Sequence, residues 1–283
     1  MRKNRVTVAA REGLLRLTEV TARPTAAVRS LPDFLVVGGQ RCGTTSLFKT
    51  LVQHRQISPP ALRKGIHYFD VHYDEGPAWY RGHFPVRRPR LGGPRRLTGE
   101  SSPYYMFHPL AGRRIADDLP DVRLLVLLRD PVERAYSAHA HESARGFETL
   151  DFEAALEQED QRLAGEAERV LFEPGYESFH LQHHGYLSRG RYLEHLQRLE
   201  QLVGRERMHV VDSGDFFSSP EATFAPVLTF LGLPQQEGIA FERHNARART
   251  AMPEALRARL AEHFAPADAG LAQWWGRTPS WRR

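Results

Sequence analysis

The sequence predicts an α/β fold, in which a single domain is built on a central parallel sheet flanked by helices. Three short apolar segments have the composition of buried strands: residues 33–39, 122–128 and 208–211. A segment with helical periodicity comes after each of them: residues 44–53, 131–144 and 220–231. Continuous apolar strands that alternate with helices are typical of a parallel sheet covered on both faces. Such sheets bind ligands at the carboxyl ends of their strands, so the loops after these segments are the first places to search for a site.

Length and composition limit the domain organisation. The chain has 283 residues, 41% of them apolar and 26% charged, which is typical of a soluble globular protein. This length is near the upper limit for one hydrophobic core, so we expect one large domain, residues 32–283, with a peripheral N-terminal arm, residues 1–31. Within the arm we expect a short helix over residues 8–20. No apolar segment approaches the roughly 18 residues of a membrane-spanning helix, which excludes an integral membrane protein. The single cysteine, Cys42, and the lack of a signal-peptide core predict a cytoplasmic location.

Charge and histidine content exclude two further classes of function. The net charge is only +5, from 39 basic and 34 acidic residues, and the arginines are dispersed, which does not predict a nucleic-acid-binding surface. The pairs His139/His141 and His183/His184 lack a third ligand at a diagnostic spacing, so we predict no metal site. Nothing in the sequence indicates an oligomeric state.

The loop after the first predicted strand is a candidate anion site. It joins a strand to a helix, so its backbone N–H groups and the helix N-terminus converge on one point. Gly38 and Gly43 have the spacing of a nucleoside-triphosphate loop, but Thr44 stands where that loop requires lysine, which disfavours an ATPase or kinase. The cation of this loop is Arg41 instead. The candidate binding residues are Gly39, Arg41, Gly43, Thr44, Thr45 and Ser46.

A second anion site is predicted after residues 122–128, where the chain reads RDPVERAYS. Pro131 suits the first turn of a helix, and Ser137 lies about two turns further on. A hydroxyl there could join Arg129 around one anion. A salt-bridged turn followed by an ordinary helical serine is the structural alternative, and this segment alone does not decide between them.

Together the two motifs resemble the sulfotransferases that use 3′-phosphoadenosine 5′-phosphosulfate (PAPS), especially the glycosaminoglycan N- and 3-O-sulfotransferase domains and their bacterial relatives. The segment FLVVGGQRCGTTSL matches the family motif G-x-[KR]-x-G-T-[TS], and residues 129–137 match R-D-P-x-x-R-x-x-S. The resemblance extends over about residues 33–281. It implies PAPS as co-substrate and 3′-phosphoadenosine 5′-phosphate (PAP) as product, with Arg129 and Ser137 at the 3′-phosphate. It also implies a basic loop that closes over the nucleotide, in which Arg247 or Arg249 could act.

Sulfuryl transfer needs a cation at the leaving oxygen and a base near the acceptor. Arg41 can supply the cation. Many relatives carry glutamate in a K-E-x-H-[FY]-F segment, but this chain reads KGIHYF, with Gly65 in the place of the carboxylate. Three residues could replace it: His67, which we favour and expect on a short strand, and Glu100 or His141. Each of the three could instead be structural.

The resemblance to the glycosaminoglycan sulfotransferases implies that the acceptor is a saccharide or a glycosylated small molecule, which is sulfated on a hydroxyl or an amine. Two alternatives remain open. One is a PAPS- or PAP-binding protein without catalysis, which Gly65 suggests. The other is a metabolite kinase with an atypical phosphate loop.

Overall fold

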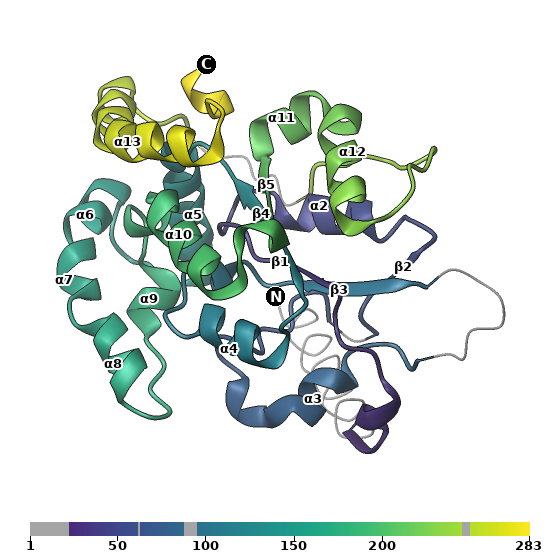
Figure 1. Ribbon diagram of the computed structural model, residues 1–283. Coiled ribbons are helices and arrows are strands. Elements are labelled where there is room, and N and C mark those ends of the chain that lie inside the picture. The colour runs from purple at the N-terminus through teal and green to yellow at the C-terminus, as the bar shows by residue number, and fades with distance from the viewer. Residues whose placement is uncertain (1–22, 62, 88–94, 245–249) are drawn as a thin grey trace, which may run out of the picture.

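A computed structural model describes residues 23–61, 63–87, 95–244 and 250–283. Five parallel strands form one sheet in the order β2-β3-β1-β4-β5 (Figure 1). Their bounds are β1 Phe34–Val36, β2 Ile57–Ser58, β3 Leu97–Ser101, β4 Arg123–Leu128 and β5 Met208–Asp212. The α/β fold with a parallel sheet is therefore confirmed.

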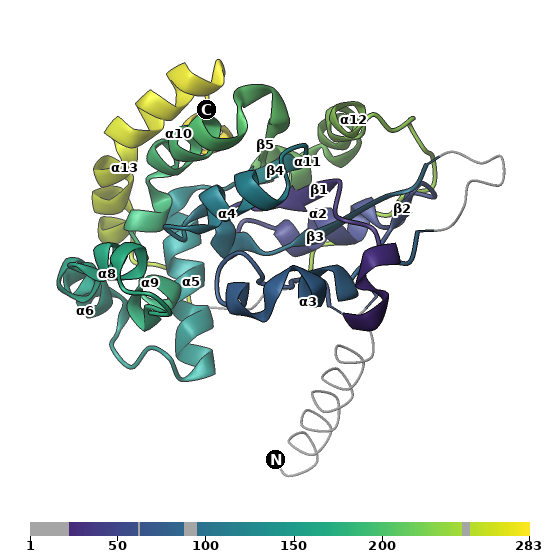
Figure 2. The ribbon, with the colours of Figure 1, turned by 60° about the horizontal axis from the view of Figure 1, so that its bottom comes forward.

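Helices cover both faces of the sheet and extend beyond one edge of it. The α-helices of the described residues are α2 Thr44–Leu51, α3 Gly76–Gly82, α4 Ala111–Asp118, α5 Pro131–Arg145, α6 Phe152–Glu157, α7 Glu159–Leu163, α8 Glu166–Phe172, α9 Phe179–His183, α10 Tyr192–Val203, α11 Ser213–Ser218, α12 Pro220–Leu231 and α13 Glu254–Trp275. Short 3-10 helices are η1 Arg23–Val28, η2 Tyr73–Glu75, η3 Pro103–Met106, η4 Ser188–Gly190, η5 Arg205–Arg207 and η6 Ser280–Arg282. Helices α6, α8 and α9 lie together at the end of the molecule remote from β2 (Figure 2).

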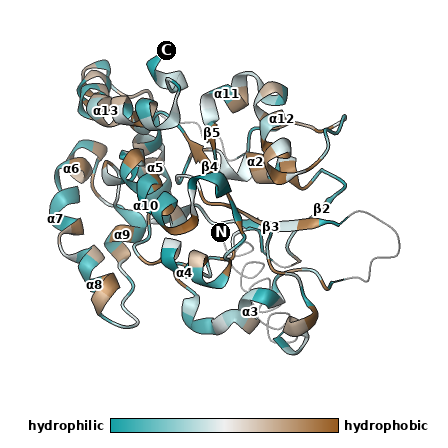
Figure 3. Cartoon of the chain, in the orientation of Figure 1, coloured by the Kyte–Doolittle hydropathy of each residue, from teal (hydrophilic) through white to brown (hydrophobic). Residues whose placement is uncertain are grey.

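Alternate side chains of the inner strands enter two separate cores. Leu35 of β1 packs with residues of α3, α4 and α10, whereas its neighbour Phe34 packs with residues of α2 and α12. This alternation follows from the two-residue period of a strand, and it explains why the inner strands are apolar throughout. In Figure 3 hydrophobic colour follows the inner strands, and hydrophilic colour dominates α7.

The acidic segment 150–169 has the composition of one solvated amphipathic helix, but the chain divides there into α6, α7 and the beginning of α8. Glu159 of this segment is buried because its carboxylate accepts hydrogen bonds from the backbone N–H groups of Tyr186, Leu187 and Ser188. The predicted helix 8–20 lies outside the described residues. The last part of the predicted arm, residues 23–31, packs on the domain, where Arg29 donates a hydrogen bond to the carbonyl of Phe84 at 2.7 Å.

Candidate functional site

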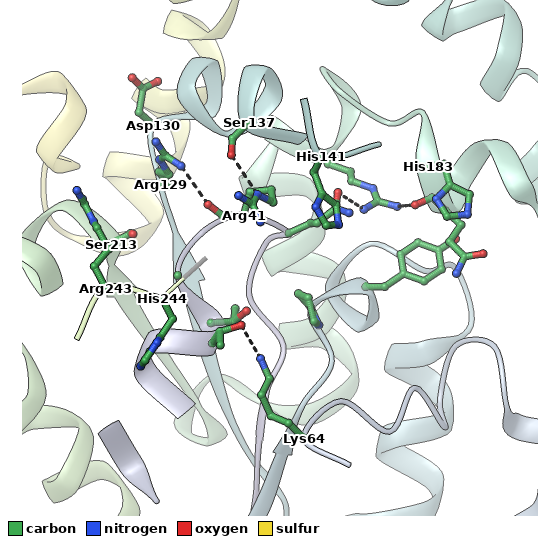
Figure 4. Close-up of a pocket in the computed structure, with 18 of the residues that line it drawn as sticks. Arg41, Lys64, Arg129, Asp130, Ser137, His141, His183, Ser213, Arg243 and His244 are labelled. Atoms are coloured by element: carbon green, nitrogen blue, oxygen red, sulfur yellow. Dashed lines mark hydrogen bonds between the residues drawn. The ribbon is translucent and has the colours of Figure 1, made fainter. Parts of the chain in front are cut away.

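A cavity of about 750 Å³ opens beside the carboxyl ends of β1, β4 and β5 (Figure 4). This is the edge at which parallel sheets place their ligands. The cavity brings together most of the site residues that the sequence predicted: Arg41, Gly43, Thr44, Thr45, His67, Arg129, Ser137 and His141. Three of the remaining predicted residues, Gly39, Ser46 and Glu100, are described by the structure but do not line it.

The loop between β1 and α2 is shaped by close backbone approaches. A Cβ atom at Gly38 would lie 2.1 Å from the backbone nitrogen of Leu127, so no other residue fits there without a shift of β4. Gly43 caps α2 in the left-handed region, with φ 93°. Arg41 has φ 70°, a conformation that is uncommon for a residue with a side chain and that gathers at functional sites. Ser46 does not line the cavity, and its hydroxyl accepts a hydrogen bond from the backbone N–H of His244, which does.

The two predicted anion sites are in direct contact. Arg41 Nε donates to Ser137 Oγ at 3.0 Å, and Arg129 Nη1 donates to the carbonyl oxygen of Arg41 at 3.2 Å (Figure 4). Arg129 also pairs with Glu133 at 3.2 Å, one turn along α5. The loop after β1 and the N-terminal half of α5 therefore form one continuous polar wall.

Lys64 was not assigned a role from the sequence, yet it adds a third cation beside Arg41 and Arg129 at this wall. Its Nζ donates a hydrogen bond to Thr45 Oγ1 at 2.7 Å, and Thr45 belongs to the first turn of α2, which lines the cavity. Burial lowers the pKa of this ammonium to about 8, against the opposing effect of Glu100. The sequence does contain a signal for Lys64, because it is the lysine of the KGIHYF segment that also holds Gly65 and His67.

His67 lines the cavity from a loop, not from the predicted strand. Its φ is 58°, which no strand residue adopts, and its backbone N–H donates to Ser102 Oγ at 3.0 Å. The imidazole Nδ1 lies 2.8 Å from Oδ2 of Asp70, a carboxylate whose side chain is fully buried. Burial opposes a charge on the ring, but Asp70 outweighs it and raises the pKa of His67. This geometry fixes a proton on Nδ1 and leaves Nε2 for a substrate.

Glu100 lies behind His67 and is completely buried. Its Oε2 accepts a hydrogen bond from Ser102 Oγ at 2.7 Å, and the same hydroxyl accepts from the backbone of His67. Burial raises the pKa of Glu100 to about 7, although the hydrogen bond from Ser102 opposes this shift. The position of this carboxyl suits a residue that orients the His67 loop, because a group that takes a proton from substrate must be within reach of the substrate.

Of the remaining predicted residues, His141 lines the cavity, and the two arginines of the predicted basic loop lie outside the described residues. His141 lies four residues after Ser137 on α5, and both line the cavity, as the helical spacing predicted. Arg247 and Arg249 lie outside the described residues. Within the described ranges, no cluster of three or more His, Cys, Asp or Glu side chains has the arrangement of a metal site. No helix among the residues with assigned structure is long and apolar enough to cross a membrane.

A family model for the sulfotransferase domain matches residues 31–250. The chain belongs to this sulfotransferase domain family. The family resemblance predicted from the two loop motifs is therefore confirmed. A solved sulfotransferase from Alicyclobacillus acidocaldarius is 30% identical and superposes with a TM-score of 0.64, covering 90% of this chain and 100% of that one.

Curated sulfotransferases also match the chain. Heparan sulfate glucosamine 3-O-sulfotransferase 6 of Mus musculus is 29% identical over 271 residues, which cover 89% of this chain and 74% of the relative. Membrane-associated sulfotransferase kil1 of Dictyostelium discoideum is 38% identical over 109 residues, 38% of this chain and 22% of the relative. The matched part thus spans less than a quarter of the length of kil1, and 24% of a bifunctional heparan sulfate N-deacetylase/N-sulfotransferase 1 from Caenorhabditis briggsae.

Proposed function

We propose that this sulfotransferase-family chain transfers the sulfuryl group of PAPS to a hydroxyl or amine of a saccharide or small-molecule acceptor, with residues 32–283 as the catalytic domain. One observation carries the proposal: a single cavity gathers the side chains of both predicted anion sites and a histidine, His67, that is backed by the buried Asp70. A donor with phosphates at both its 3′ and 5′ positions needs two such sets, and the acceptor needs a base.

In this proposal the nucleotide spans the polar wall. The first turn of α2, with Lys64 and Arg41, holds the 5′-phosphosulfate, because backbone N–H groups at a helix N-terminus and two cations favour a doubly charged group. Arg129 and Ser137 hold the 3′-phosphate. Phe217 also lines the cavity, beneath the guanidinium of Arg243 at 4.4 Å, and offers an aromatic surface to the purine.

His67 is the base of the proposed reaction. Its Nε2 takes the acceptor proton while the acceptor oxygen or nitrogen bonds to sulfur, and the bond from sulfur to the 5′-phosphate oxygen breaks. The electron pair of that bond remains on the phosphate, whose charge Lys64 and Arg41 neutralise. The Asp70 carboxylate stabilises the imidazolium that forms, as in other histidine–carboxylate pairs.

Two measurements on the purified chain test this function. Titration calorimetry should give tight binding of PAP and much weaker binding of Mg-ATP, and incubation with sulfur-35-labelled PAPS and an acceptor panel should give labelled product. PAP binding without turnover on any acceptor would instead identify a binding protein that lacks catalysis, the alternative suggested by Gly65. Phosphoryl transfer from Mg-ATP would identify a kinase and overturn the proposal.

A further inference from the structure

A second histidine that is paired with a buried carboxylate lines the same cavity and has no part in the proposed donor site. His183 of α9 has its Nδ1 2.9 Å from Oε2 of Glu142, which belongs to α5. Both side chains are buried, and His183 reaches the cavity surface. In Figure 4, His141 and His183 lie on one side of Arg41, and Arg129 and Asp130 lie on the other. His183 is therefore on the opposite side of Arg41 from Arg129, the arginine of the proposed 3′-phosphate site.

A chain of hydrogen bonds fixes the chemistry of this pair. Arg189 Nη1 donates to Gln40 Oε1 at 3.1 Å, and Gln40 Nε2 donates to Glu142 Oε1 at 2.8 Å. A guanidinium only donates and a carboxylate only accepts, so the orientation of the Gln40 amide is determined. Burial opposes the charge of Glu142, but the hydrogen bonds from His183 and Gln40 hold the pKa of this carboxyl below its ordinary value.

The Glu142 carboxylate only accepts, so Nδ1 of His183 carries a proton, and in the neutral form of the ring the lone pair is on Nε2. None of the described residues forms a hydrogen bond with that Nε2. The ring packs against the rings of Phe147 and Phe179, with centroids 4.3 and 4.6 Å away, and these contacts together with the Glu142 hydrogen bond hold its orientation. The cavity thus offers a preorganised hydrogen-bond acceptor on this side of Arg41.

The partner of such an atom must bring a hydrogen. A carbonyl, ether or anionic oxygen has none to donate, whereas a hydroxyl or an amine does. We propose that His183, positioned by Glu142, binds a second hydroxyl of the acceptor while a first hydroxyl is deprotonated at His67. This inference rests on the proposed sulfuryl transfer, and it makes the acceptor a polyhydroxylated molecule such as a glycoside or a cyclic polyol, in contrast to a simple phenol or alcohol.

Substitutions at position 183 separate the two ring nitrogens. His183→Asn keeps an N–H for Glu142 but removes the atom that faces the acceptor, and His183→Gln places an amide oxygen near Nε2. His180→Asn is the matched control, because His180 lies on the same helix but does not line the cavity. Calorimetry with PAP verifies that each variant retains its fold and donor site.

The assay compares kcat/KM for two polyhydroxylated acceptors, methyl β-D-glucopyranoside and myo-inositol, with that for two single-hydroxyl acceptors, cyclohexanol and 2-naphthol. We expect the wild type to prefer the first pair. His183→Asn should reduce this preference about tenfold or more, mainly through KM, because a buried polar group loses its partner. His183→Gln should retain part of the preference, and His180→Asn should match the wild type.

Two results would overturn the inference while leaving the sulfotransferase function intact. One is a wild type that uses cyclohexanol or 2-naphthol as efficiently as the polyhydroxylated acceptors. The other is a His183→Asn variant that loses efficiency equally on both classes. Failure of the wild type to transfer label from PAPS to any acceptor would instead contradict the proposed function itself.

Discussion

Arg129 gives the sharpest test of the donor site, because the proposal assigns it to one phosphate of the nucleotide. A charge-assisted hydrogen bond contributes about 1.5 to 3 kcal/mol. The Arg129 side chain is 31% exposed and shares its charge with Glu133 at 3.2 Å, which places the contribution in the lower half of that range, at about 1.5 to 2 kcal/mol. Arg129→Ala should therefore weaken PAP binding roughly 10- to 30-fold.

Calorimetry with PAP and with adenosine 5′-phosphate, which lacks the 3′-phosphate, measures this discrimination. The variant should lose affinity for PAP and bind adenosine 5′-phosphate as the wild type does. Glu133→Gln should act in the opposite direction and tighten PAP binding a few-fold, because it removes a negative charge next to Arg129. Arg113→Ala, at an exposed arginine paired with Asp117, is the control. An equal loss for both nucleotides in Arg129→Ala would refute the assignment and indicate that Arg129 only supports the loop.

Three further predictions concern the residues around the proposed reaction centre. Asp70→Asn should lower kcat about 100-fold or more in the labelled-PAPS assay and leave PAP affinity unchanged. The amide N–H of asparagine can donate to Nδ1 of His67, and the ring proton then lies on Nε2, where it blocks the base. An unchanged kcat would contradict the assignment of His67 as base. The pKa of Lys64 is about 8, and a bound anion should raise it. At pH 8 the protein should therefore take up a fraction of a proton when PAP binds, which calorimetry in buffers of different ionisation enthalpy measures. Lys64→Met should abolish this proton uptake. The pKa of Glu100 is about 7 in the folded state and near 4.5 in the unfolded chain, so the folded state binds more protons between these pH values. The free energy of unfolding of the wild type should therefore fall by up to about 3 kcal/mol as the pH rises from 4.5 to 7, and Glu100→Gln should flatten this dependence in urea unfolding. The same pH dependence in the wild type and in the variant would refute the prediction.

Strands β1, β4 and β5 could be predicted because each contains a continuous run of apolar residues. Strands β2 and β3 were missed because they lack such a run. The chain reads LTGES over β3, which contains no run of apolar residues, yet every residue of β3 is buried. Gly99 is required there because a Cβ atom would lie 2.5 Å from the carbonyl oxygen of Phe34 in the neighbouring strand. Close backbone approach between strands distant in sequence leaves no periodic signal, so hydropathy could not have identified β3.

The same distinction applies to the site. Residues within one loop or helix could be predicted together, and the structure brings Arg41 and Ser137 into direct contact. The pairing of His183 with Glu142 joins residues 41 positions apart on two helices, and no motif spacing encodes it. The left-handed backbone of His67 is likewise set by tertiary contacts, here the Ser102 hydroxyl, against the local preference of the residue.

Gly65 connects the departure from the family motif with the proposed base. A Cβ atom at position 65 would lie 3.5 Å from Nε2 of His67 and 3.0 Å from the carbonyl oxygen of Ser101. Gly65 is outside the left-handed region, so its backbone does not require glycine. A carboxylate at this position would begin beside the imidazole nitrogen that faces the cavity, and it would compete with the acceptor for that nitrogen. With glycine there, Nε2 stays accessible and Asp70 remains the carboxylate partner of the ring, which is the arrangement that a histidine base requires.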